Sequence, residues 1–317
     1  MSNCFIGIDT SNYTTSCAAC DETGNVFANI RVPLPVADGE RGLRQSEAVF
    51  AHVKNLPAAM EELREKIRNK RVLAVGVSEW PRRVEGSYMP CFLSGVAAAQ
   101  SLAAPIDAPV YRFAHQEGHI MAALYSAGKT DLVGKEFLAF HVSGGTTEVL
   151  LVRPAEIGFS VSLLGGSADL HAGQAIDRVG VLMGLKFPCG KEMEQLAATH
   201  SGRVPPARIS VKDAECHLSG LENLAGGLWA KTGDRALVSA FVSEFLAKTL
   251  EKMTEGAESF CPELPVVYAG GVMSNRFLQA RLGKRKETYF AKPEFSADNA
   301  AGVALLCRKN YLNEHII

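Results

Sequence analysis

Apolar residues in the first part of the chain fall into short continuous runs separated by stretches with helical spacing. The runs at residues 5–10, 72–77 and 110–113 are typical of buried β-strands. Residues 41–68 carry apolar side chains at helical spacing, and Pro57 within them predicts a kink or a division into two helices. The pattern therefore predicts an α/β domain, in which the next helix begins near His115.

The same pattern restarts near residue 137. Residues 137–142 predict a strand, residues 143–145 a turn and residues 146–152 a returning strand. Helices are expected at 172–185, 191–199, 235–260 and about 298–312, a strand at 266–269, and a loop-rich stretch at 201–233. Two similar halves, each opened by a strand and a small polar turn, indicate an actin-like ATPase duplication with a nucleotide cleft between two α/β domains. We expect domains at 1–128 and 129–297, followed by a C-terminal helix at 298–317.

The amino-acid composition is that of an ordinary globular protein and excludes few functional classes. The 317 residues include 33 basic and 34 acidic side chains, for a formal charge of −1. Any RNA partner must therefore meet a local patch or a helper subunit rather than a basic surface. The start of the chain does not resemble a signal peptide, and the most apolar helical segment is about ten residues long, half of what a bilayer requires. We expect a cytoplasmic protein without a membrane partner.

Eight cysteines are scattered without paired metal-ligand spacing. Only Cys17 and Cys20 have a redox-like interval, and they fall in a predicted strand, whereas redox pairs begin helices. This cysteine usage fits a reducing compartment.

The sharpest chemical pattern is His-Gln-Glu-Gly-His at residues 115–119. Residues four apart share one helix face, so His115 and His119 can ligate one divalent ion, although two unrelated surface histidines are an equal alternative. Asp298, at a helix start, is a candidate third ligand or simply an N-cap. Zinc peptidases place glutamate directly after the first histidine, but here Gln116 stands there and Glu117 follows, so peptidase chemistry is disfavoured.

Glycine-rich turns supply candidate phosphate contacts. The Ser-Gly-Gly turn at 143–145 lets backbone N–H groups approach phosphate oxygens, and Gly270-Gly271 precede a helix near Asn275. Each is also explained by a plain hairpin or helix start. Asp177 could accept hydrogen bonds from a ribose and Gly190 could let a sugar lie against backbone, while a solvent-facing Asp–Arg pair is the alternative. The spacing around Gly190 excludes a P-loop.

Taken in order, these motifs resemble one family over nearly the whole chain. His-x-x-x-His, Val-Ser-Gly-Gly-Thr-Thr, Ala-Gly-x-Ala-x-Asp with Pro-x-Gly, Ala-Gly-Gly-Val-x-x-Asn-Arg and Asp-Asn-Ala-Ala are similar to the TsaD family of tRNA threonylcarbamoyladenosine synthases. The resemblance implies an actin-like ATPase fold whose C-terminal helix returns Asp298 to the histidines of the first domain.

The resemblance also implies a reaction and a set of binding residues. A threonylcarbamoyl group would pass from threonylcarbamoyl-AMP to the adenosine beside the tRNA anticodon, with help from partner subunits. One divalent metal, iron or zinc, would be held by His115, His119 and Asp298. The adenine nucleotide, threonylcarbamoyl-AMP or ATP, would be held by His141, Val142, Ser143, Gly144, Gly145, Asp177, Gly190 and Asn275. No residue is assigned as the general base.

Three segments depart from the family pattern. The first hairpin reads Asp-Thr-Ser-Asn-Tyr-Thr-Thr at 9–15, Thr146 replaces a histidine, and residues 78–86 replace a Gly-Pro-Gly loop. These departures leave two alternatives open: a paralogue that transfers a carbamoyl-type group to a non-tRNA acceptor, and a non-catalytic scaffold for an active relative. Arg82, Arg83 and the cluster at 281–286 are candidate tRNA-phosphate contacts or simply solvated charges.

Overall fold

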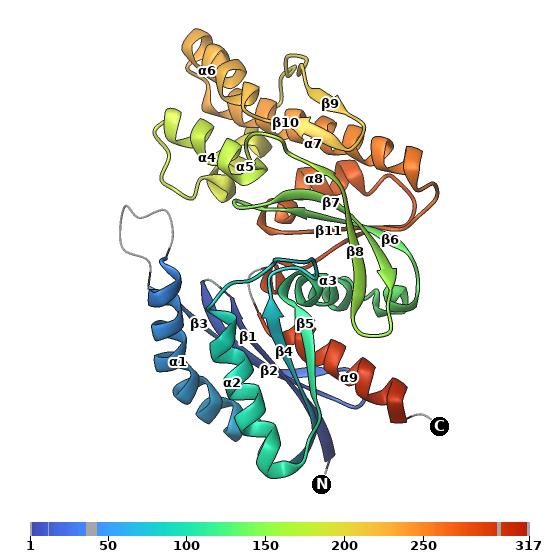
Figure 1. Cartoon of the computed structure of the whole chain (residues 1–317). Coiled ribbons are helices and arrows are strands. Elements are labelled where there is room, and N and C mark those ends of the chain that lie inside the picture. The colour runs from blue at the N-terminus through green and yellow to red at the C-terminus, as the bar shows by residue number, and fades with distance from the viewer. Residues whose placement is uncertain (1, 12, 36–42, 297–298, 316–317) are drawn as a thin grey trace. The chain divides into compact units, whose positions relative to one another are not determined.

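The computed structural model describes residues 2–11, 13–35, 43–296 and 299–315. The chain forms two compact units, coloured along the sequence in Figure 1. Unit 1 comprises Met1–Gly134, Pro154–Val161 and Glu294–Ile317, and unit 2 comprises Lys135–Arg153 and Ser162–Pro293. Each unit is therefore assembled from segments that are distant in sequence.

Unit 1 is built on a mixed sheet. Its described strands are β1 (Ser2–Ser11), β2 (Thr14–Asp21), β3 (Val26–Pro33), β4 (Lys70–Trp80) and β5 (Val110–Ala114). They lie in the order β3-β2-β1-β4-β5, with β1–β2 and β2–β3 antiparallel and β1–β4 and β4–β5 parallel. From Cys4 onward every residue of β1 is buried, as expected for a central strand covered on both faces.

Helices cover both faces of this sheet (Figure 1). They are α1 (Gln45–Lys66), α2 (Phe92–Ala103), α3 (His115–Ser126) and α9 (Ala301–His315), with 3₁₀ turns η1 (Ala104–Ile106), η2 (Thr130–Gly134) and η4 (Pro293–Phe295). Ile6 and Ile8 of β1 pack in the core beneath α1 and α2. Gly7, between them, faces α9: a Cβ there would lie 2.4 Å from the Ala304 nitrogen. Successive residues of a strand point to opposite faces of the sheet, so Gly7 faces α9 while Ile6 and Ile8 face the other side. Only a glycine at this position leaves room for the helix backbone against the strand.

Helix α1 excludes one of the two alternatives that the sequence left open at Pro57. Pro57 lies inside a single continuous helix, Gln45–Lys66, and does not divide it. Pro57 has no backbone N–H, so it cannot donate the helical hydrogen bond to the carbonyl of Val53, four residues earlier. Both residues are exposed. Water can therefore satisfy that carbonyl, and the buried face of Leu56, Ala59 and Leu63 remains intact.

Unit 2 repeats the sheet plan of unit 1. The strands of its main sheet are β6 (Phe137–Val142), β7 (Thr147–Pro154), β8 (Phe159–Gly166), β11 (Val266–Ala269) and β12 (Thr288–Phe290), in the order β12-β11-β6-β7-β8. The connection between β7 and β8 and the first residues of β8, up to Val161, belong to unit 1. As in unit 1, the first strand pairs antiparallel with its hairpin partner and parallel with a later strand. The two sheets therefore have matching strand orders, as the loose repeat in the sequence predicts.

Helices of unit 2 surround its own core. They are α4 (Ala172–Leu182), α5 (Gly190–Thr199), α6 (Gly220–Thr232), α7 (Arg235–Phe260) and α8 (Arg276–Leu282), with η3 (Gly271–Ser274) and the small hairpin β9 (Ser210–Lys212) and β10 (Glu215–His217). Helix α6 and this hairpin show that the expectation of a loop-rich stretch at 201–233 was wrong from residue 210 onward, whereas residues 201–209 form neither helix nor strand. In the portion of the chain that the structure describes, no helix has the length and apolar character needed to cross a bilayer.

Asp169 fastens the loop before α4 to the start of α6. Its Oδ1 accepts hydrogen bonds from the Leu218 N–H at 2.8 Å and the Leu170 N–H at 2.6 Å. Its Oδ2 accepts from both the N–H and the hydroxyl of Ser219. Burial alone would raise the pKa of this carboxyl, but the hydrogen bonds from Ser219, Leu218 and Leu170 outweigh it and hold the pKa well below its usual range.

We expect Asp169→Asn to lower the free energy of unfolding by about 1–3 kcal/mol near neutral pH, because an amide cannot accept all these hydrogen bonds. A carboxyl whose pKa is depressed in the folded state stabilises above its unfolded pKa of about 4 and loses that contribution as pH falls below it. The difference between native and variant in urea titrations should therefore shrink in acid. Asp107→Asn is the matched control, because Asp107 is exposed in a left-handed turn that asparagine also accepts. Equal stability of Asp169→Asn and the native chain at pH 7 would refute this role.

Candidate metal and nucleotide sites

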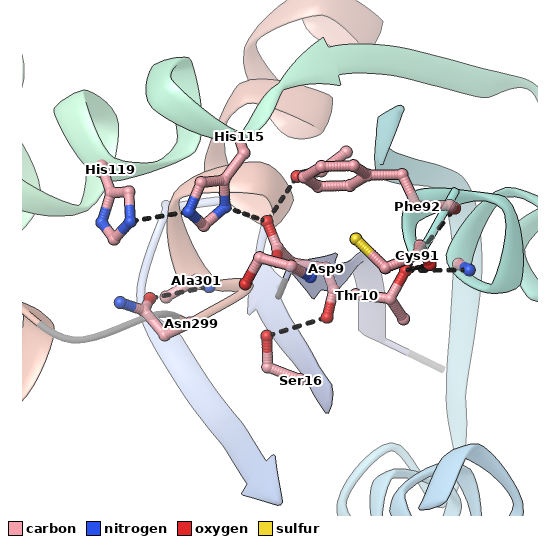
Figure 2. Close-up of polar contacts among 12 residues, drawn as sticks. Asp9, Thr10, Ser16, Cys91, Phe92, His115, His119, Asn299 and Ala301 are labelled. Atoms are coloured by element: carbon pink, nitrogen blue, oxygen red, sulfur yellow. Dashed lines mark hydrogen bonds and ion pairs between the residues drawn. The ribbon is translucent and has the colours of Figure 1, made fainter. Parts of the chain in front are cut away.

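The two histidines of the sequence motif lie side by side at the start of α3. Strand β5 runs directly into this helix, so His115 occupies its first residue and His119 the next turn. The two Nε2 atoms are 2.9 Å apart, and the rings meet edge to face with centroids separated by 4.4 Å. Figure 2 shows His115 between His119 and Asp9. Both imidazoles are partly buried and direct the same ring nitrogen to one place.

Asp9 is a component of this site that sequence reasoning missed. Its carboxylate is 1% exposed, and its Oδ2 lies 2.7 Å from His115 Nδ1. The Ser78 hydroxyl donates to the same oxygen at 2.6 Å, and the Ser11 N–H donates to Oδ1 at 2.9 Å. Since a carboxylate can only accept, His115 Nδ1 carries the proton. The lone pair of neutral His115 is then on Nε2, the nitrogen that faces His119.

This donor set fits a divalent metal. Two imidazole nitrogens that share a tetrahedral zinc, each about 2.0–2.1 Å from it, are about 3.3 Å apart. A small separation of the two rings from the 2.9 Å seen here would accommodate an ion. Histidine ligands characteristically donate their other ring N–H to a carboxylate, as His115 does to Asp9.

The third expected ligand, Asp298, lies outside the described residues. Within the described ranges, no group of three histidine, cysteine, aspartate or glutamate side chains could hold a metal. The next residue, Asn299, is 4% exposed, and its Oδ1 accepts a hydrogen bond from the Ala301 N–H at 3.1 Å (Figure 2). The ligand role of Asp298 stays a prediction.

Glu117 does not join the histidines. Its buried carboxylate pairs with Arg83, whose Nε lies 2.7 Å from Oε1. Residues 116 and 117 therefore offer no geometry of the zinc-peptidase kind, in which a glutamate beside the first histidine activates the metal-bound water.

In unit 2, the Ser-Gly-Gly turn lies at the carboxyl end of β6. The Ser143 hydroxyl accepts hydrogen bonds from the N–H groups of Gly145 and Thr146, and the Ser143 carbonyl accepts from the Gly173 N–H at 3.0 Å. A Cβ added to Gly144 or Gly145 would meet no heavy atom within 4 Å, so backbone is accessible there. The turn is thus held against the start of α4 while its glycines remain open.

The glycine pair that follows β11 lies next to this turn. Gly270 has a φ of 101°, and a Cβ there would lie 2.2 Å from the Val142 carbonyl oxygen. His141 and Val142 end β6, in register with Ala269 and Thr147 respectively. The carboxyl ends of parallel β6 and β11 therefore bring both glycine turns together, which is where α/β sheets bind ligands.

The other nucleoside candidates already have backbone partners. Asp177 Oδ1 accepts a hydrogen bond from the Cys189 N–H at 2.7 Å, just before Gly190 begins α5. Burial raises the pKa of the Asp177 carboxyl, and the Cys189 hydrogen bond partly offsets this. Asn275 caps α8 by accepting from the Leu278 N–H at 3.1 Å. Asn275 is therefore the N-cap of α8, and it also borders a cavity.

That cavity, of about 380 Å³, lies within unit 2. It is bordered by α5, α7 and the start of α8, and its polar lining comes from Glu194, His200, Ser243, Glu244, Asn275 and Arg276. The Glu194 carboxylate accepts from the Arg276 N–H at 2.8 Å, which ties α5 to α8 beside the cavity. Cavities of a few hundred cubic ångströms that combine apolar walls with polar groups are typical small-molecule sites.

The arginines of the basic cluster at residues 281–286 already form ion pairs with glutamates, so they are less available to RNA phosphates than the sequence indicates. Arg281 pairs with Glu251 and Glu244, and Arg285 pairs with Glu258. Arg83 is engaged by Glu117. These arginines therefore do not form an unpaired basic patch for RNA phosphates.

Comparison with known proteins supports both fold and family. Component A of (R)-2-hydroxyglutaryl-CoA dehydratase from Acidaminococcus fermentans aligns at 14% identity, covering 98% of this chain and 100% of that one, with a TM-score of 0.53. Full-length HypF aligns at 13% identity, covering 98% of this chain and 55% of that one, with a TM-score of 0.59. A ROK family glucokinase from Streptomyces griseus aligns at 13% identity over 97% and 100%, with a TM-score of 0.50. The actin-like ATPase fold expected from the sequence is confirmed.

A family model matches residues 37–305 and carries the description "TsaD: tRNA N6-adenosine threonylcarbamoyltransferase". The matched range contains both histidines, the glycine turns of unit 2 and the segment that begins α9. The chain therefore belongs to the TsaD family, a family of tRNA-modifying transferases.

Proposed function

We propose that this chain transfers a threonylcarbamoyl group from threonylcarbamoyl-AMP to the exocyclic amine of the adenosine beside the tRNA anticodon. The reaction depends on one divalent metal, iron or zinc, held by His115, His119 and Asp298. The family match supports the reaction class. The observation that carries the proposal for this chain is the pair of imidazoles whose Nε2 atoms lie 2.9 Å apart.

The buried residues around this pair prepare it for a metal. Asp9 accepts a hydrogen bond from the Nδ1–H of His115 and so keeps the Nε2 lone pair directed toward His119. Ser78 and the Ser11 N–H hold the Asp9 carboxylate in place. The chemistry that a metal supplies when bound here is Lewis-acid stabilisation of the charge on the carbamoyl oxygen, together with orientation of the threonyl group.

Unit 2 supplies the nucleotide side of the proposal. The exposed backbone of Gly144 and Gly145 would lie against the phosphate of the adenylate, with the Gly144 N–H as a donor. Asp177, Gly190 and the cavity beside Asn275 would hold its nucleoside, with room for an adenosine-sized group. AMP leaves as the amine nitrogen forms its bond to the carbamoyl carbon.

RNA recognition would depend on partner subunits. The net charge is −1, and the arginines of the 281–286 cluster are paired with glutamates. A chain without an excess of positive charge binds a polyanion weakly by itself. We therefore expect the transfer to require added subunits that contact tRNA.

The direct test supplies threonylcarbamoyl-AMP, unmodified tRNA and candidate partner subunits, and analyses the digested nucleosides by mass spectrometry. We expect threonylcarbamoyladenosine only when the native chain is present, and an assay without the partners controls for their contribution. A chain that binds metal and adenylate but modifies no tRNA would overturn the tRNA proposal in favour of another acceptor. A chain that binds neither metal nor adenylate would favour a scaffold role.

A further inference from the structure

Glu117 is a buried carboxylate in the first turn of α3 that the proposed reaction does not use. It is 1% exposed. Its Oε1 accepts from Arg83 Nε at 2.7 Å, and its Oε2 accepts from Arg83 Nη2 at 3.3 Å and from the Phe159 N–H at 3.4 Å. Removing a carboxylate from water is unfavourable unless it is paired and hydrogen-bonded. Such a complete set of partners at the first turn of α3, between the two histidines in sequence, indicates a role in the placement of that turn.

Both partners come from segments outside α3. Arg83 belongs to the loop after β4, where its guanidinium lies 5.3 Å from the centroid of the Trp80 ring and its Nη2 also donates to the Arg112 carbonyl. Phe159 belongs to the 154–161 segment, which packs in unit 1. The loop and the segment therefore hold Glu117 from two directions.

Gly158 shows how closely the 154–161 segment approaches this carboxylate. Its φ is +70°, and a Cβ there would lie 1.9 Å from Glu117 Oε2. A side chain at position 158 would thus displace either the segment or the carboxylate.

Helical geometry places Glu117 opposite the metal candidates. At 3.6 residues per turn, position 117 is about 200° around the axis from 115 and equally far from 119. An anchor on that face opposes rotation of the helix about its own axis. The same rotation would swing the two Nε2 atoms away from the point at which they now meet, 2.9 Å apart.

We infer that Glu117 is a positioning residue that sets the rotation of α3, through Arg83 and the Phe159 N–H, so that His115 and His119 face one metal position. The inference rests on the proposed metal-dependent function. Glu117 itself touches neither the metal nor the substrate.

The test compares Glu117→Gln with the native full-length chain. The amide keeps the size of the side chain but loses the bidentate charge pair with Arg83. We expect the zinc Kd, measured by competition with a chromophoric chelator, to rise by about 10- to 100-fold, the range found when supporting residues of metal ligands are changed. Arg83→Lys, which retains the charge without the planar fork, should give a smaller rise.

Glu79→Gln is the matched control. Glu79 pairs with Arg112 at 2.7 Å, and Arg112 is 43% exposed, close to the 40% of Arg83. This pair joins β4 to β5 and does not involve α3, so its loss should leave zinc affinity unchanged. An equal loss of affinity in Glu79→Gln would mean that general destabilisation, not placement of α3, explains the effect.

A second measurement separates this inference from the metal proposal. In metal-free protein labelled with ¹⁵N-histidine, the ring spectra of the native chain should report the Nδ1-protonated form of His115 and its contact with His119. Glu117→Gln should change both signatures. If the native chain binds no zinc or iron, the metal proposal fails. The ring spectra then decide by themselves whether Glu117 positions α3. Native-like ring spectra and native zinc affinity in Glu117→Gln would overturn the inference.

Discussion

His119→Ala is expected to lower the affinity for zinc or iron by more than about 100-fold and to abolish threonylcarbamoyl transfer. Changes to residues that merely support a metal ligand already weaken binding by about 10- to 100-fold. Removal of one of the two imidazoles deletes a ligand outright and leaves His115 Nε2 without the partner 2.9 Å away. Metal content by mass spectrometry and nucleoside analysis of tRNA measure the two effects.

The variant should fold normally, which makes the result interpretable. His119 is only partly buried, and the pair it forms is with His115 on the same helix. His315→Ala is the control, because His315 is exposed near the end of α9 and its ring stacks on Tyr311 of the same helix. Retention of one equivalent of metal and full transfer by His119→Ala would place the metal site elsewhere.

Hydrophobic patterning predicted the architecture well where strands are buried on both faces. The runs near residues 5–10 and 137–142 are β1 and β6, the first strands of two sheets with matching strand orders. A central strand must be almost continuously apolar, so its signal survives without any knowledge of its neighbours. The duplication could therefore be read from two runs and two polar turns.

Helix α6 was missed for a physical reason. It buries only Leu221 and Ala225, so little helical periodicity is imposed on its sequence. It also contains Gly226 and Gly227, which are poor helix formers. Its start depends instead on Asp169, about 50 residues earlier in the chain, which accepts hydrogen bonds from Leu218 and Ser219.

The candidate metal site was predictable only in its local part. His115 and His119 share a helix face by spacing alone. Asp9 is 106 residues from His115, and the two meet because β1, β4 and β5 are parallel neighbours whose carboxyl ends lie at one edge of the sheet. A single carboxylate at the end of an apolar run was the available signal. Glu117 likewise depends on partners 34 and 42 residues away.

Gly302→Ala is expected to destabilise the chain and weaken metal binding together. Gly302 lies in α9, and a Cβ there would sit 1.9 Å from the Gly118 carbonyl oxygen and 2.9 Å from the Ala122 nitrogen. Both contacts are backbone of α3, so no side chain can move aside, and the two helices must separate. Overpacking of this kind lowers the free energy of unfolding by about 1–3 kcal/mol, even though alanine favours a helix by about 1 kcal/mol over glycine.

Gly227→Ala in α6 separates these two contributions. Gly227 is also helical, but a Cβ there would meet no heavy atom within 4 Å, so only the gain in helix propensity remains. We expect this control to be as stable as the native chain or slightly more so in urea titrations. The residues before Gly302 include buried Asn299, and the predicted ligand Asp298 precedes them in sequence. Separation of α9 from α3 should therefore raise the zinc Kd of Gly302→Ala under conditions in which the variant is still fully folded. Unchanged stability and unchanged Kd would show that α9 and α3 can shift apart freely, in which case close packing of these helices does not set the metal site.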